Sequence, residues 1–119
     1  MAVQQPTGVI AEQIAAVNAH DTEAIVAAFA PDAYLNDNGR EFRGAAALRE
    51  WVEREVVAAK VTVEVREVVD HYGDAIVRAV YDGDFDRTGM PPEILLSNYY
   101  AVRDGKITSL LIVFRPAAS

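Results

Sequence analysis

The sequence predicts an α+β domain in which helices cover one face of an antiparallel sheet, and two observations lead to this prediction. Between Thr7 and Lys60, apolar residues recur mostly with the spacing of a helix. From Val61 onward they alternate with the two-residue period of a strand, and turns containing glycine or proline divide this half into four strands. Helices followed by strands joined by short turns are typical of the α+β class.

Two helices are expected before the first strand. Thr7 is a potential N-cap for the first helix, and Asp21 is a potential N-cap for a second, shorter one. Pro31 prevents the second helix from continuing. The first helix would bury Ile10, Ile14 and Val17, and the second Ile25, Ala28 and Phe29.

A short hairpin and a third helix follow. Residues 33–38 alternate like a strand, Asn38-Gly39 is a turn signal, and residues 41–43 form the returning strand. Gly44 opens the third helix. One face of this helix would consist of Leu48, Trp51, Val52, Glu55 and Val56.

The first strand carries an acid on the face that should be buried. With the period of a strand, Ala33, Leu35 and Asp37 share one face. A carboxylate in this position has two interpretations. Asp37 lines a pocket and takes part in chemistry there, or it accepts backbone N–H bonds and stabilises the Asn38-Gly39 turn.

The second half of the chain is expected to form an antiparallel meander. Its strands would span residues 61–72, 75–85, 93–103 and 106–115. Val68 and Val69, two adjacent apolar residues, interrupt the alternation of the first of these strands and predict a bulge. Asp104-Gly105 is expected to form the tight turn between the last two strands.

The last two strands are apolar on both faces. In the strand over residues 93–103, one face would consist of Ile94, Leu96, Tyr100 and Val102 and the other of Leu95, Tyr99 and Ala101. In the strand over residues 106–115, one face would consist of Ile107, Leu111 and Val113 and the other of Leu110, Ile112 and Phe114. The helices can cover only one of these faces. Because a large exposed apolar patch usually marks a partner surface, the sequence predicts a homodimer through the outer sheet face.

Composition narrows the classes of partner. The chain has 119 residues and a mass of 13.0 kDa, which is the size of one domain with its own core. Eleven Lys and Arg residues against eighteen Asp and Glu residues give a formal charge of -7, which argues against nucleic acid and membrane as partners. There is no cysteine, no signal-peptide pattern and no membrane-length apolar run, so a cytoplasmic location is expected.

The sequence resembles a known superfamily in two stretches: AHDTEAIVAAFAPDAYLNDNGREFRGAAALREWVE, residues 19–53, and VRDGKITSLLI, residues 102–112. Both are similar to the SnoaL-like branch of the nuclear-transport-factor-2-like superfamily, which includes ketosteroid isomerases, polyketide cyclases and limonene epoxide hydrolases. The resemblance implies that residues 1–119 form a single SnoaL-like domain. In that fold a curved antiparallel sheet forms a cone around three N-terminal helices, with an apolar pocket inside, and the protein is usually a dimer.

The resemblance also implies catalytic positions. Asp37 matches the proton-shuttling carboxylate of ketosteroid isomerase-like enzymes, and an apolar pocket would favour its neutral form and make it a more effective base. The two oxyanion donors of those enzymes fall here on Gln13 and Asn98, which replace a tyrosine and an aspartate. Either amide can donate a hydrogen bond. The alternative is that Gln13 reaches solvent from a helix edge and that Asn98 bonds a neighbouring backbone group.

Five aromatic residues are candidates for pocket walls and would bind an apolar ligand. They are Phe29, Trp51, Tyr81, Tyr100 and Phe114. Ordinary core packing is the alternative for each of them. No metal site is expected, because the two histidines are far apart in the sequence and form no ligand-spaced pair.

The leading hypothesis is a cofactor-independent enzyme of isomerase or cyclase type, which abstracts a proton from an apolar carbonyl or polyketide-like compound. One alternative is a non-catalytic module that binds a hydrophobic ligand or serves as a dimeric accessory. A further alternative is an epoxide hydrolase, in which Arg78 and Asp84 would approach Asp37. The sequence leaves open whether the protein is an enzyme and which substrate it takes.

Overall fold

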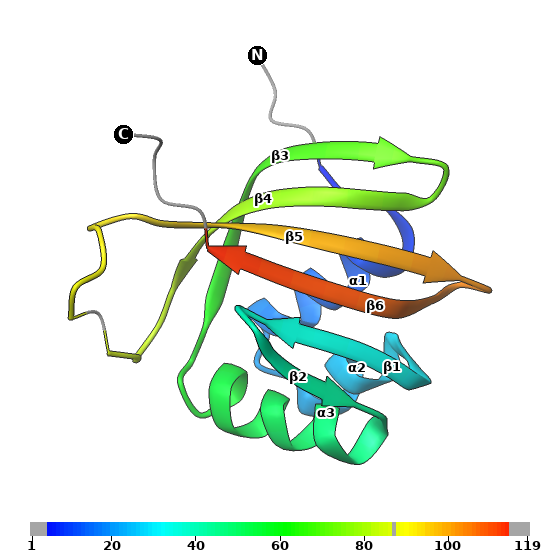
Figure 1. Ribbon diagram of the computed structural model, residues 1–119, viewed down its shortest axis with the longest axis horizontal. Helices are drawn as coiled ribbons and strands as arrows, with labels where there is room; N and C mark the ends of the chain where they lie inside the picture. Colours follow the sequence, from blue (N-terminus) through cyan, green and yellow to red (C-terminus); the bar gives the residue numbers. More distant parts are fainter. Residues whose placement is uncertain (1–4, 87, 115–119) are drawn as a thin grey trace.

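In the computed structural model, which describes residues 5–86 and 88–114, helices pack on one side of a curved, six-stranded sheet (Figure 1). This arrangement confirms the predicted α+β class. The helical elements are α1 (Gly8–Asn18), α2 (Thr22–Ala27), α3 (Ala45–Trp51) and the π-helical segment η1 (Val52–Val57). The strands are β1 (Phe29–Asp37), β2 (Arg40–Arg43), β3 (Thr62–His71), β4 (Asp74–Asp82), β5 (Ile94–Arg103) and β6 (Lys106–Phe114). Arg115, the predicted end of the last strand, lies outside the described residues.

The sheet contains the predicted meander and one pairing that the sequence did not suggest. Its strand order is β2-β1-β6-β5-β4-β3, so the sheet is open and β2 and β3 form its edges. The strands from β3 to β6 pair antiparallel in chain order, whereas β1 pairs parallel to β6. The parallel pairing places Asp37 opposite Ile112, on the last strand of the meander. The N-terminal hairpin therefore becomes part of the same curved surface as the C-terminal strands.

The first two helices begin as predicted, but the second ends earlier. Asp21 caps α2 by accepting a hydrogen bond from the backbone N–H of Ala24 at 3.1 Å, while Thr7 occupies the N-cap position of α1 without a side-chain bond. Helix α2 ends at Ala27, and Phe29 is the first residue of β1, where it pairs with Ile107. The prediction that Phe29 belongs to the second helix was wrong. Its backbone is paired with β6 in the sheet, and a longer α2 would have given up this pairing.

The third helix buries the predicted face over two kinds of helical turn. Leu48 and Trp51 are buried in α3, and Val52 and Val56 are buried in η1. The helix changes to π geometry after Trp51, and the backbone N–H of Ala58 donates to the carbonyl of Glu53. Side chains of both segments therefore face the inner side of the sheet.

Two irregularities in the strands differ from the predicted pattern. The register of β3 against β4 shifts between Val65 and Glu67, not at the predicted Val68-Val69 position, since both of those residues keep regular partners on β4. A second shift between β5 and β6 falls after Ala101. It rotates Ile107 onto the inner face, where it is fully buried. The predicted grouping of Ile107 with the outer residues Leu111 and Val113 was wrong for this reason.

The core lies between the inner face of the sheet and the helices. Its fully buried side chains include Ile25, Leu35, Leu48, Val52, Val77 and Leu110. Among residues 5–86 and 88–114, no helix has the length and apolar character that crossing a membrane requires.

Candidate functional site

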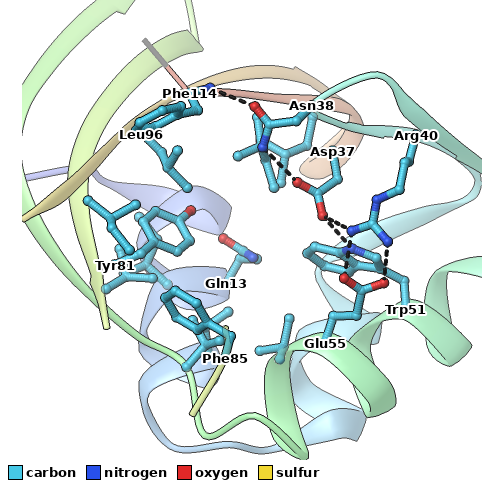
Figure 2. A pocket seen from close by; sticks show the side chains of 18 of the residues that line it. Gln13, Asp37, Asn38, Arg40, Trp51, Glu55, Tyr81, Phe85, Leu96 and Phe114 are labelled. Atoms are coloured by element: carbon cyan, nitrogen blue, oxygen red, sulfur yellow. Dashed lines mark hydrogen bonds and ion pairs between the residues drawn. The ribbon is translucent and has the colours of Figure 1, made fainter. Parts of the chain in front are cut away.

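A pocket of about 560 Å³ opens between the inner face of the sheet, α1 and the helix formed by α3 and η1 (Figure 2). Most of its wall is apolar, and it includes Ile14, Val63, Leu96, Leu110, Ile112 and Phe114. The polar side chains come from separate elements: Gln13 from α1, Asp37 from β1, Arg40 from β2, Glu55 from η1, Tyr81 from β4 and Tyr100 from β5, with Asn38 in the turn after β1 and Asp86 in the loop after β4. An apolar space with a few convergent polar groups is typical of a small-molecule site.

Asp37 lines this pocket, as the first of the two interpretations predicts, and its carboxylate is hydrogen-bonded there to three side chains. The carboxylate does not stabilise the turn, because Asn36 Oδ1 accepts the hydrogen bond from the Gly39 N–H at 2.8 Å. It is not unpaired either. Asp37 Oδ2 accepts hydrogen bonds from Trp51 Nε1 at 3.1 Å and from Arg40 Nη2 at 2.6 Å, while Oδ1 accepts one from Asn38 Nδ2 at 3.1 Å. These contacts hold the carboxylate in one orientation at the pocket edge.

Arg40 connects Asp37 to a second carboxylate. The two residues are opposite each other across the β1–β2 hairpin, and Arg40 also makes two hydrogen bonds to Glu55, at 2.8 and 2.6 Å. The hydrogen bonds that Arg40 donates to Glu55, followed by the one that it donates to Asp37, raise the pKa of Arg40, so its guanidinium stays charged. The result is a row of carboxylate, guanidinium and carboxylate along the mouth of the pocket, which Figure 2 shows.

Arg40 was not among the residues predicted for such a set, and Arg78 and Asp84 were predicted in its place. Arg78 is exposed and lies 3.8 Å from Glu67, and Asp84 is also exposed. Neither lines the pocket, so their predicted approach to Asp37 was wrong. The turn signal at Asn38-Gly39 could have pointed to Arg40, because a tight hairpin places the residue after the turn opposite the residue before it.

Gln13 presents a hydrogen-bond donor to the pocket. Its side chain is buried, and the Tyr100 hydroxyl donates a hydrogen bond to its Oε1 atom at 2.7 Å. The amide nitrogen is thereby directed into the pocket, as Figure 2 shows, and it has no acceptor among the residues that the structure describes. Burial raises the pKa of Tyr100, so this hydroxyl remains protonated and keeps its role as donor.

Asn98 is buried behind the pocket and does not line it. Its amide nitrogen donates to the backbone carbonyl of Val77 at 3.0 Å and to that of Leu96 at 3.5 Å, and its Oδ1 accepts the Tyr81 hydroxyl at 2.5 Å. Both amide hydrogens therefore have partners in the backbone. Asn98 is not available as the oxyanion donor that the sequence suggested, and it orients Tyr81 instead.

Four of the five predicted wall aromatics line the pocket: Trp51, Tyr81, Tyr100 and Phe114. Phe29 does not, because it packs in the core at the start of β1. Among the apolar wall residues that were not predicted, Phe85 and Met90 lie in the loop between β4 and β5. The sequence assigned Phe85 to the end of the strand over residues 75–85, but β4 ends at Asp82, and the loop that follows has no periodicity that would place these side chains.

The comparisons with known proteins agree with this architecture. The SnoaL-like domain family matches residues 10–110. A candidate polyketide cyclase from Sinorhizobium meliloti is 28% identical, with a TM-score of 0.78 over 88% of this chain and 93% of that one. A hypothetical protein with a ketosteroid isomerase-like fold from Catenulispora acidiphila, in complex with trimethylamine, is 20% identical, with a TM-score of 0.78 over 92% of this chain and 87% of that one. The second likeness shows the fold alone. No curated protein matches the chain.

Proposed function

Because the chain belongs to the SnoaL-like domain family, we propose that it is a cofactor-independent enzyme that removes a proton from the carbon next to a carbonyl group in an apolar, polyketide-like compound. Asp37 is the base, and Gln13 donates a hydrogen bond to the carbonyl oxygen. The observation that carries the proposal is that a carboxylate and a free amide N–H face the same apolar pocket from opposite elements.

The two groups have complementary roles in such a reaction. Removal of an α-proton moves negative charge onto the carbonyl oxygen, and a donor already directed at that oxygen stabilises the charge without reorganising. Asp37 Oδ1 has one described hydrogen bond, from Asn38, whereas Oδ2 has two. A carboxylate oxygen can accept a further proton in this arrangement, so Oδ1 is the atom that would receive it.

Arg40 and Glu55 support a base whose charge changes during the reaction. When Asp37 accepts a proton it becomes neutral. If Asp37 were the sole partner of Arg40, the guanidinium would then have no negative charge beside it. The two hydrogen bonds with Glu55 keep the guanidinium compensated in both states. Arg40 and Glu55 are therefore positioning residues in this proposal.

The single neutral donor restricts the substrate class. An amide N–H is a modest stabiliser of an enolate, so the reaction suits a carbon acid whose enolate is already delocalised. A 1,3-dicarbonyl unit, which is the repeating chemistry of a polyketide chain, has this property. The likeness to the candidate polyketide cyclase from Sinorhizobium meliloti supports the same class.

Deuterium exchange tests the proposal directly. The protein is incubated in deuterated water with 2-tetralone, an apolar ketone with activated α-protons, and loss of the α-proton signal is followed by NMR. We expect exchange faster than in buffer with an equal concentration of serum albumin. Binding of 2-tetralone without any acceleration would contradict the proposal and favour a module that only binds a hydrophobic ligand.

Epoxide hydrolysis is a second candidate because of the carboxylate–guanidinium–carboxylate row formed by Asp37, Arg40 and Glu55. Such a row can hold a water molecule between a base and a cation, and limonene-type hydrolysis was expected to need an acid–arginine–acid set. Conversion of styrene oxide to its diol by the protein, with no exchange of 2-tetralone, would favour this reaction over proton abstraction.

We also propose that the protein is a homodimer through the outer sheet face, where Figure 1 shows no helix over the strands. The outward side chains of this face include Ile76, Val80, Leu95, Tyr99, Leu111 and Val113, and Leu111 is 37% exposed. A specific interface of roughly 1,200–2,000 Å² in total would cover them. Light scattering is expected to show a dimer at micromolar concentration, and Leu111→Glu should shift it toward monomer. A monomeric wild-type protein would contradict the proposal.

A further inference from the structure

We propose that the pocket selects a hydroxy-carbonyl compound, because Tyr81 offers its phenolic oxygen to the ligand as an acceptor and not as a donor. This inference rests on the proposed function in one respect, namely that the pocket binds an apolar carbonyl compound. It adds a second polar group to that ligand and assigns it to a specific residue.

The orientation of the Asn98 amide is the first step. Asn98 is 1% exposed, and its nitrogen lies 3.0 Å from the backbone carbonyl of Val77 and 3.5 Å from that of Leu96. Both neighbours of this nitrogen are acceptors, so the amide group has its NH₂ on their side. Rotating the amide by half a turn would bring its oxygen against these two carbonyl oxygens. The backbone of β4 and β5 therefore fixes the direction of the Asn98 carbonyl.

The single proton of Tyr81 is the second step. With the Asn98 Oδ1 atom as its neighbour at 2.5 Å, the phenol must donate to it, and no second hydroxyl proton exists for a ligand. Figure 2 shows the Tyr81 oxygen directed into the pocket, so its lone pairs are what a ligand meets. Burial raises the pKa of Tyr81 more than the bond to Asn98 lowers it, so the phenol keeps its proton.

The contrast with Gln13 is the third step. At Gln13 the hydrogen bond from Tyr100 occupies the amide oxygen and leaves N–H groups for the ligand. At Tyr81 the bond to Asn98 occupies the proton and leaves an acceptor. Apart from the charged and polar groups at its mouth, the pocket wall is mainly apolar, so a ligand group of the wrong polarity at Gln13 or Tyr81 is desolvated without gaining that hydrogen bond. A carbonyl oxygen suits Gln13 and a hydroxyl group suits Tyr81.

Three ligands that share the 2-acetylnaphthalene skeleton test this assignment by calorimetry on the wild-type protein. The first is 2-acetyl-6-hydroxynaphthalene, the second has a methyl group in place of the hydroxyl, and the third has a second acetyl group there. We expect the hydroxyl compound to bind roughly threefold to tenfold more tightly than the other two, which is the usual range for one neutral hydrogen bond. These comparisons need no variant and do not depend on how a variant folds.

Tyr81→Phe then identifies the residue responsible. In this variant the hydroxyl compound should bind no more tightly than the methyl compound. The matched control is Tyr34→Phe, which removes a hydroxyl that contacts Glu41 and Asn36 outside the pocket and should leave the preference unchanged. The readout is the ratio of the affinities for the hydroxyl and methyl compounds. A general loosening of the pocket would lower both affinities and leave their ratio unchanged.

Each other outcome has a distinct meaning. Equal binding of all three compounds by the wild-type protein would overturn this inference and leave the proposed function standing. Tightest binding of the diacetyl compound would show that Tyr81 donates, and it would overturn the inference as well. A hydroxyl preference that persists in Tyr81→Phe would overturn the role of Tyr81. Failure of all three compounds to bind would overturn both the inference and the proposed function.

Discussion

Asp37→Asn is expected to abolish exchange of the α-proton of a bound ketone while the protein remains folded. Asparagine keeps the shape of the side chain and can still accept a hydrogen bond from Trp51 Nε1, but it cannot accept a proton. Loss of a general base typically lowers a rate by roughly 10²–10⁴-fold. The exchange of 2-tetralone protons into deuterated water, followed by NMR, measures this loss.

The stability of the same variant has a defined expectation. Replacing a buried and unpaired carboxylate would stabilise the protein. Asp37, however, accepts hydrogen bonds from Arg40 and Trp51, and the replacement weakens these. Because Arg40 retains Glu55, we expect a cost of only about 1 kcal/mol in the free energy of unfolding. Asp84→Asn, which changes an exposed carboxylate outside the pocket, is the matched control. Undiminished exchange in Asp37→Asn would remove Asp37 from the mechanism.

Gly83→Ala is expected to destabilise the protein strongly. Gly83 follows β4 with φ of +154°, and a Cβ atom placed on it would lie 2.9 Å from the backbone oxygen of Ala59 and 3.1 Å from the Cα of Val61. Neither backbone atom can move without shifting the segment that enters β3. Backbone strain of about 1–3 kcal/mol and crowding of about 1–3 kcal/mol together predict a loss of roughly 2–6 kcal/mol in the free energy of unfolding.

Gly105→Ala separates strain from crowding. Gly105 also has a positive φ, of +72°, but a Cβ atom there would contact nothing within 4 Å. Its replacement should cost only the strain, about 1–2 kcal/mol. Chemical denaturation of both variants gives the two values. Equal losses of stability in the two variants would show that the close approach of Ala59 and Val61 to Gly83 adds no cost to its replacement.

Local spacing in the sequence was sufficient to predict most elements and the face on which Asp37 lies. The alternation of Ala33, Leu35 and Asp37 depends only on the two-residue period of a strand, and the order of helices and strands follows from where the period changes. The caps and turns at Asp21 and Asp104-Gly105 are equally local. Such features depend on a few neighbouring residues, so a single sequence contains the necessary information.

Contacts between distant segments were not predictable in the same way. Helical spacing assigned Phe29 to a helix, but pairing with Ile107 places it in β1. An extra residue in a strand changes the face of every residue beyond it, and its position depends on the partner strand. For this reason the bulge in β3 and the inward rotation of Ile107 appear only once β4 and β5 are in place.

The sequence by itself determined the α+β class, the order of the elements and the presence of an acid, Asp37, on an inward strand face. The tertiary structure alone decided what that acid contacts. Asp37 accepts hydrogen bonds from Trp51 on α3 and from Arg40 on β2, and Arg40 is also bonded to Glu55 on η1. The Asn98 carbonyl faces Tyr81 because two backbone carbonyls accept hydrogen bonds from its amide nitrogen. The physical reason is that side-chain hydrogen bonds form between groups that the packed backbone brings together, and their donors and acceptors are assigned only by those neighbours.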